Sequence, residues 1–289
     1  MMLAGLDHVV VAVNAIDPAI EAYRTVLGRA PCWRAAGEGG VAVAMFALAN
    51  LSVELMAPVD DGPVAERLRS VLAVEGEGLV SLAFATKDLT AAYRRFARVG
   101  LSPEPIVQGD SFDAFTGRTR SWRRTRIAAA AASGLRLFVL ERDHALPPSP
   151  VDHGVAPEAA VASVDHVVIT TSDPERAAAL FGARLGLNLR LDQSFPDLGA
   201  RLQFFRLGDA ILEVSTSLAQ AGERPDRLFG LAFGVPDAEA ARARLLSRGL
   251  DVSPVRDGRK AGTKVFTVRK GVAGAPLLML QDQGARNEA

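Results

Sequence analysis

A histidine and a glutamate recur together at matching positions in two distant parts of this 289-residue sequence. His8 and Glu54 form the first pair, and His166 and Glu213 form the second, offset by 158 and 159 residues. All four stand in apolar, strand-like runs, where a charge without a partner is costly. An imidazole and a carboxylate in such a setting are suited to binding a metal ion or to moving a proton.

The repetition extends well beyond these four residues. Asp17-Pro18 recurs as Asp173-Pro174, and Leu27-Gly28 recurs as Leu185-Gly186, with offsets of 156 and 158 residues. A spacing held this closely over some fifty residues indicates a duplicated structural element that is longer than a solenoid repeat.

Each copy has the pattern of a strand, a helix and three strands, which we call a βαβββ module. The apolar run at 6–13 predicts a buried strand, and Asp17 before Pro18 predicts the N-cap of a helix that ends at Gly28. Strands are expected near 30–36, 40–48 and 50–57. The same order recurs from Leu79 and again in the second half, which predicts four modules at 5–57, 79–141, 163–216 and 228–282.

The modules predict an α+β fold of two tandem domains, at residues 1–143 and 162–283. Residues 144–161 between them are rich in proline and small side chains and include Pro147-Pro148-Ser149-Pro150. Such a composition is typical of a linker. We therefore expect the first proteolytic cuts within about 143–160, leaving two stable halves.

The composition argues against several classes of partner. Lys+Arg and Asp+Glu balance at 33 each, which gives no reason to expect nucleic acid or an anionic membrane. A single cysteine, Cys32, excludes an intrachain disulfide and fits a reducing compartment. There is no signal-like start and no apolar run of roughly 20 residues. The expectation is a cytoplasmic protein that binds a small organic molecule, with a homodimer as a further option.

The Asp-His-Val-Val openings, the Asp-Pro helix starts, the Leu-Gly helix ends and the two glutamate strands together resemble the vicinal oxygen chelate superfamily. That superfamily includes glyoxalase I, extradiol dioxygenases and bleomycin-resistance proteins. In it, two modules curl into a half-open barrel, or cup, around a divalent metal (Zn, Ni, Mn, Fe or Co). The resemblance implies Glu54 or Glu213 as the catalytic proton carrier, and as metal ligands His8, Glu54, His166 and Glu213.

The sequence also departs from the family pattern. Ser81 and Gly230 stand where modules two and four would place the first-strand ligand, and Phe138 and Leu278 stand where a glutamate would be expected. A cup built from modules one and two, or three and four, then holds one histidine and one glutamate. Swapped partners, one with four and three with two, give the same count, whereas catalytic zinc sites usually supply three ligands. Candidates for a third ligand are Glu77, Asp113 and Glu141.

Two functions remain open. The first is a metal-assisted lyase or isomerase that stabilises an enolate or oxyanion of a small oxygenated substrate. Extradiol dioxygenase chemistry fits less well, because its second histidine would stand at Gly230. The second function is a non-catalytic binding or resistance protein, which sequesters a small molecule in a cup with a degenerate site and no metal.

Residues 118–126 form a second candidate feature. If this arginine-rich segment is a strand, alternation places Arg120, Trp122 and Arg124 on one face. Guanidinium groups beside an indole suit a carboxylate, a phosphate or an aromatic ring, so these residues are candidates for substrate binding. The competing interpretation is a solvated face or a contact with the partner domain.

Overall fold

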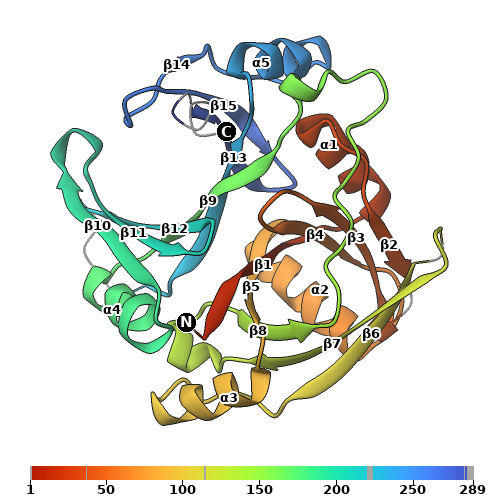
Figure 1. Cartoon of the computed structure of the whole chain (residues 1–289), viewed down its shortest axis with the longest axis vertical. Helices are drawn as coiled ribbons and strands as arrows, with labels where there is room; N and C mark the ends of the chain where they lie inside the picture. Colours follow the sequence, from red (N-terminus) through yellow and green to blue (C-terminus); the bar gives the residue numbers. More distant parts are fainter. Residues whose placement is uncertain (1, 37, 114, 220–223, 283, 285–289) are drawn as a thin grey trace. The chain divides into compact units, whose positions relative to one another are not determined.

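The structure, a computed structural model, describes residues 2–282 except 37, 114 and 220–223, together with Gly284. It is an α+β fold with two eight-stranded mixed sheets, as the sequence predicts (Figure 1). Among the described residues, no helix has the length and apolarity needed to cross a membrane.

The first sheet and its helices run from residue 3 to residue 142. Module one consists of β1 (Leu3–Ala12), α1 (Ile16–Leu27), β2 (Trp33–Ala36), β3 (Val41–Ala47) and β4 (Ser52–Pro58). Helix α2 (Pro63–Glu75) follows. Module two consists of β5 (Gly78–Thr86), α3 (Leu89–Arg98), β6 (Val107–Asp113), β7 (Arg118–Arg126) and β8 (Leu137–Arg142).

The second sheet repeats this order from residue 163 to residue 282. Module three consists of β9 (Ser163–Thr170), α4 (Pro174–Ala178) with a π-helical turn (Ala179–Arg184), β10 (Asn188–Phe195), β11 (Ala200–Leu207) and β12 (Ala210–Ser217). Module four consists of β13 (Arg227–Gly234), α5 (Ala238–Ser247), β14 (Arg256–Asp257), β15 (Thr263–Val272) and β16 (Ala275–Asp282).

The strand order shows which modules share a sheet. It is β2-β3-β4-β1-β5-β8-β7-β6 in the first sheet and β10-β11-β12-β9-β13-β16-β15-β14 in the second. Modules one and two therefore form one sheet, and modules three and four form the other. Consequently the pair His8 and Glu54 and the pair His166 and Glu213 lie in different sheets.

The chain also divides into two compact units. Unit 1 comprises Met1–Val10, Val80–Ala145 and His166–Phe229, and unit 2 comprises Val11–Leu79, Leu146–Asp165 and Gly230–Ala289. Unit 2 thus groups most of module one with the connecting segment and most of module four. The domain boundaries expected from the sequence remain a prediction.

Aspartates begin three of the helices, because a carboxylate at the N-cap accepts hydrogen bonds from backbone N–H groups that lack partners in the helix. Asp88 accepts from Ala91 N at 2.9 Å, Asp173 accepts from Arg176 N at 2.9 Å, and Asp237 caps α5 in the same way. The expected cap at Asp17 is wrong. Helix α1 begins at Ile16, and the Asp17 carboxylate instead pairs with Arg34 at 2.6 Å.

Helix α2 has no counterpart among the predicted elements. It packs on β4 within unit 2, and Figure 1 shows β3 and β4 lying between α1 and α2. Tyr23 of α1 contacts Phe46 of β3, so α1 covers the face that holds Phe46 and its cross-strand partner Val53. Glu54 lies on the opposite face, and only 6% of its surface is exposed.

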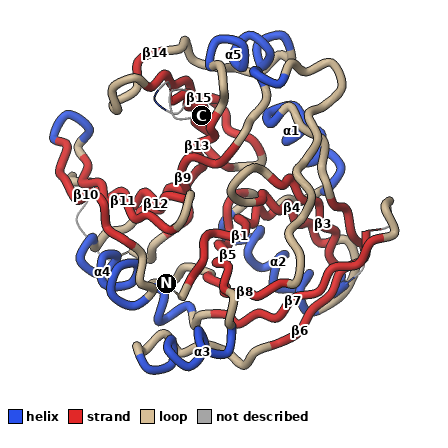
Figure 2. Tube along the Cα trace, viewed as in Figure 1, coloured by secondary structure: helices blue, strands red, loops and turns tan. Residues whose placement is uncertain are grey.

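The segment at 144–161 lies outside both sheets, but hydrogen bonds hold it against unit 2. In unit 2, the Ser149 amide donates to the Ala47 carbonyl at 2.9 Å, and the Ser149 hydroxyl accepts from the Ala47 amide at 3.0 Å. The side chain of Arg29 donates to the carbonyl groups of Ser149 and Val161. Figure 2 shows this segment as loop running beside α1 and β3. Several of its backbone groups are thus paired within unit 2, and the linker expected from the sequence remains a prediction.

Helix α5 also contacts the segment at 144–161, through Arg244. The half-buried guanidinium of Arg244 donates to the Ala159 carbonyl at 3.0 Å, and to the carbonyls of Thr25 and Val26 at the end of α1. Burial lowers the pKa of Arg244 to about 10, and the charge of Arg248 adds to this effect. The group remains protonated at neutral pH and complements the negative end of the α1 dipole.

Candidate active site

Strands β9 and β12 run parallel in unit 1, with Ile211 beside His166 and Glu213 beside Val168. Phe181 of the π-helical turn contacts Phe205 of β11 at 5.6 Å, so the helix covers the face that holds Phe205. On the other face, alternating side chains are partly exposed. We call this the open face of β9–β12. By register it comprises His166, Val168, Thr170, Leu202, Phe204, Arg206, Ile211, Glu213 and Ser215.

His166 and Glu213 meet on this open face. Their closest atoms, Nε2 of the imidazole and Oε2 of the carboxylate, are 3.4 Å apart. The side chains are 11% and 18% exposed, which leaves both accessible from the open face. The ring of Phe204, opposite Glu213 in the register of β11 and β12, stands edge-on to the His166 ring at 6.5 Å.

The distance between Nε2 of His166 and Oε2 of Glu213 can be compared with the distance between two ligand atoms of one metal ion. Two ligands that each lie about 2.1 Å from one ion, at a tetrahedral angle, are about 3.4 Å apart. The His166–Glu213 distance matches this value. However, no group of three or more His, Cys, Asp or Glu placed to hold an ion occurs within the described part of the chain. The pair fits a divalent ion in chemistry and spacing, but it supplies one protein ligand fewer than catalytic zinc sites usually have.

The three candidates for a third ligand have other partners. The Glu77 carboxylate accepts from the backbone and the side-chain amides of Asn14. Asp113 is buried and binds Phe115 N and the Thr116 hydroxyl. Glu141 accepts from Leu89 N at 2.7 Å, at the start of α3, and also binds Arg123.

His8 has a partner that the sequence analysis did not identify. Its Nδ1 lies 2.7 Å from the buried carboxylate of Asp7, and Arg142 Nε holds the other oxygen of that carboxylate at 2.8 Å. Burial acts to raise the pKa of Asp7, but the hydrogen bond with His8 and the charges of Arg142 and Arg120 outweigh it and leave the pKa below its ordinary value. An ionised Asp7 only accepts hydrogen bonds, so Nδ1 of His8 carries the proton that it donates to this carboxylate.

Glu54 and His8 belong to different units, so their pairing stays a prediction. What the structure shows within unit 2 is that Glu54 is buried on the face of β4 opposite α1. Its counterpart Glu213 is more accessible. The two glutamates at matching positions therefore differ in exposure.

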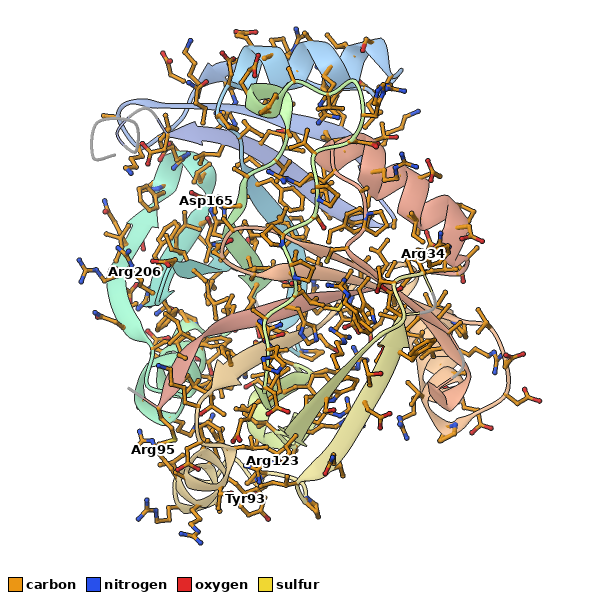
Figure 3. All side chains as sticks on the ribbon, turned by 45° about the vertical axis from the view of Figure 1, so that its right-hand side comes forward. Arg34, Tyr93, Arg95, Arg123, Asp165 and Arg206 are labelled. Atoms are coloured by element: carbon orange, nitrogen blue, oxygen red, sulfur yellow. The ribbon has the colours of Figure 1, made fainter. Side chains whose placement is uncertain are left out.

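The arginine-rich segment forms strand β7, as expected, and its side chains alternate. Arg120 lies 5.1 Å from the ring centroid of Trp122, while Arg124 and Arg126 lie over the ring of Phe138 at 5.4 and 5.2 Å. Such cation–π contacts fix the guanidinium groups. Arg123 is on the other face with Glu141, and Figure 3 places it near Tyr93 of α3. The substrate-binding role of Arg120, Trp122 and Arg124 stays a prediction.

Close packing on β6 supports the position of the indole. A Cβ atom added at Gly109 would lie 2.9 Å from the Trp122 ring, a distance that real Cβ contacts do not show. A side chain at position 109 would therefore displace the Trp122 ring. No pattern in the sequence indicates this contact, because it depends on the register of β6 and β7.

Comparison with known families identifies this arrangement. A family model described as "Glyoxalase-like domain" matches residues 6–162, which is more than half of the chain. The chain belongs to the glyoxalase-like family. A second model, "Glyoxalase/Bleomycin resistance protein/Dioxygenase superfamily", matches residues 165–267. The glyoxalase-like chain is thus a tandem of two such domains, as the motifs predicted.

Solved structures show the same fold across nearly the whole glyoxalase-like chain. A mutant of 4-hydroxymandelate synthase from Streptomyces coelicolor aligns with a TM-score of 0.68 at 14% identity, over 98% of this chain and 94% of that one. The Mn(II)-bound glyoxalase from Novosphingobium aromaticivorans aligns at 0.63 with 13% identity, over 97% and 83%. A hypothetical protein from Staphylococcus aureus aligns at 0.62 with 8% identity, over 96% and 99%. No curated protein matches the sequence.

Proposed function

We propose that this chain is an enzyme that moves a proton on a small oxygenated organic substrate, by lyase or isomerase chemistry, at the open face of β9–β12. The observation that carries the proposal is the approach of His166 and Glu213 to 3.4 Å on a partly exposed face. Glu213 takes the proton from a carbon next to a carbonyl, and His166 hydrogen-bonds the oxygen on which negative charge develops.

A divalent ion bound by His166 and Glu213 would polarise the substrate oxygens and stabilise the enolate. The chain's own contribution is to hold the carboxylate and the imidazole in fixed positions on two hydrogen-bonded strands. The register of β9 and β12 provides this, because each strand is anchored by the buried residues of its other face, Val167 and Ile169 on β9 and Leu212 and Val214 on β12.

We place the site at Glu213 and not at Glu54 because the two glutamates differ in the segments that pack around them. Helix α2, in the connection at 59–77, packs on β4, where Glu54 is buried. The corresponding connection after β12, at 218–226, is about half as long, and its described residues form no helix. Glu213 therefore remains accessible to a substrate, whereas Glu54 lies in the interior.

A second candidate function is binding without catalysis. The observation that favours it is the absence, within the described residues, of a cluster of three metal-ligating side chains. Gly230 and Leu278 occupy the positions where module four would supply ligands. In this case the open face would sequester a small molecule, and His166 and Glu213 would only hydrogen-bond it.

Solvent deuterium exchange separates the two functions. The protein, purified without chelator and assayed for metal per chain, is incubated in D2O with α-hydroxyketones with and without added Mn²⁺ or Zn²⁺. Enzyme function predicts labelling next to the carbonyl, reduced at least a hundredfold in Glu213→Gln and His166→Ala. Glu175→Gln is the control, because that carboxylate is exposed and pairs with Arg201 outside the site. Saturable binding of the same compounds without any labelling would instead support sequestration.

A further inference from the structure

The face of β6–β8 that holds Trp122 is rich in arginine. By register it carries Arg118, Arg120, Arg124 and Arg126 of β7 and Arg142 of β8. Within these three strands, all of whose residues are described, the acidic residue of this face is Asp113 of β6. Asp113 is buried and accepts from Phe115 N and the Thr116 hydroxyl, and Arg142 pairs with Asp7 of β1. We call this the Trp122 face, and its charge within the three strands is positive.

Aromatic rings hold three of these guanidinium groups in place. Arg120 lies 5.1 Å from the ring centroid of Trp122, and Arg124 and Arg126 lie 5.4 and 5.2 Å from that of Phe138. All five side chains are partly buried. A solvated face would leave long arginine side chains extended into water, whereas this arrangement has already lost much of its rotamer freedom. Binding a ligand here therefore costs less entropy than binding it at mobile side chains.

The indole of Trp122 gives the same face a broad aromatic surface. Trp122 and Gly109 are register partners, and a Cβ atom added at Gly109 would lie 2.9 Å from the ring. The ring therefore reaches across to β6 and covers the place where a side chain of that strand would stand. Arg124 is two residues along β7 from Trp122, a distance of about 7 Å in a strand.

This combination of groups favours one class of ligand. Guanidinium groups bind carboxylates through planar, bidentate hydrogen bonds, and they also stack on aromatic rings. Each presents five N–H donors, which is more than one neighbour uses. An indole contributes stacking to any planar ring. A molecule with a flat ring and an anionic group a few ångströms away matches the spacing of Trp122 and Arg124.

We infer that the Trp122 face binds an aromatic carboxylate. The ring of the ligand lies against Trp122 and the guanidinium of Arg120 beside it, and the carboxylate binds Arg124. This inference is independent of the proposed function, because β6–β8 belong to the first sheet, whereas His166 and Glu213 lie in the second.

NMR of the full chain measures binding at this face directly. The chain has two tryptophans, and the indole N–H signal of Trp122 reports on the site, while that of Trp33, which is buried in unit 2, is an internal control. Benzoate is compared with uncharged benzamide and with non-aromatic cyclohexanecarboxylate at constant ionic strength. We expect benzoate to shift the Trp122 signal, with a Kd about tenfold below that of benzamide and about fivefold below that of cyclohexanecarboxylate.

Two neighbouring arginines provide matched variants. Arg124→Gln should weaken benzoate about tenfold. Arg123→Gln should leave its affinity unchanged, because Arg123 is on the opposite face of β7, where it pairs with Glu141. The comparison of benzoate with benzamide needs no variant, so the inference stays testable if Arg124→Gln folds poorly.

Four results would overturn the inference: no shift of the Trp122 signal, equal affinity for benzoate and benzamide, equal weakening by Arg124→Gln and Arg123→Gln, or tighter binding of inorganic phosphate than of benzoate. Glu213→Gln should bind benzoate like the unmodified protein. Failure of the proposed function would therefore leave this result unchanged, and the reverse also holds.

Discussion

At the scale of single residues, the two histidines differ in what holds them. His166 approaches a glutamate on the neighbouring strand, whereas His8 is held by the adjacent Asp7, which Arg142 in turn fixes. A buried carboxylate between an imidazole and a guanidinium is stabilising only while it is ionised. The stability of the first sheet should therefore depend on the charge of Asp7.

Asp7→Asn should lower the free energy of unfolding at pH 7 by about 1.5–3 kcal/mol, through loss of charge-assisted hydrogen bonds. The folded-state pKa of Asp7 is below its ordinary value. Its contribution is therefore fully present above the unfolded pKa of about 3.9 and is lost as the pH falls through the folded pKa. Urea unfolding at pH 7 and at several values below 4 measures the difference between the two proteins, which should shrink on acidification.

Asp17→Asn provides the comparison, because Asp17 is 76% exposed and its pair with Arg34 contributes little. A difference for Asp7→Asn that stays constant across the pH range would argue against an ionised, paired carboxylate in the folded state.

At the scale of elements, the segment at 144–161 is held by backbone hydrogen bonds although its composition is typical of a linker. Its prolines lack N–H donors, yet the Ala30 amide donates to the Pro150 carbonyl, and the Val161 amide donates to the Leu27 carbonyl. The Arg29 side chain also donates to the carbonyl groups of Ser149 and Val161, and burial lowers the pKa of its guanidinium. A protease needs an extended, accessible chain, so this segment should resist cleavage.

Limited digestion with proteinase K, followed by mass spectrometry, should show no early cuts within 146–162 of the unmodified protein. Arg29→Ala removes two carbonyl partners and should make this segment an early cleavage site. Arg34→Ala, which removes the half-exposed pair with Asp17, should leave the pattern unchanged. Early release of two halves from the unmodified protein would restore the loose-linker interpretation.

At the scale of the whole molecule, the duplication has produced one buried and one partly exposed glutamate at matching positions. The difference lies in the connections that follow β4 and β12, since only the longer one carries a helix among its described residues. Matching residues in duplicated modules are then expected to serve stability in one copy and chemistry in the other.

Replacing each glutamate by glutamine tests whether Glu54 serves stability and Glu213 serves chemistry. Glu54→Gln should lower the free energy of unfolding by about 1–3 kcal/mol, because it disturbs a buried, partnered carboxylate, and should leave deuterium exchange intact. Glu213→Gln should abolish exchange and change stability less. Loss of exchange in Glu54→Gln, with exchange retained in Glu213→Gln, would place the working site in the first copy.

The sequence by itself determines the local elements and the repeated couple. Apolar runs predict the first strand of each module, and Asp88, Asp173 and Asp237 begin the helices that follow. These features depend on nearest neighbours in the chain, so spacing alone reveals them. The recurrence of histidine and glutamate likewise indicates a site without any coordinates.

Tertiary structure alone decides which groups meet and which remain accessible. The contacts of Asp7 with Arg142 and of Ser149 with Ala47 join residues more than 100 positions apart. The edge-on contact of Phe204 with His166 depends on the register of three strands. Asp17 resembles a cap in sequence, but helix α1 begins one residue earlier and the carboxylate binds Arg34. Burial and pairing are properties of a packed chain, because they depend on what other segments bring to each residue.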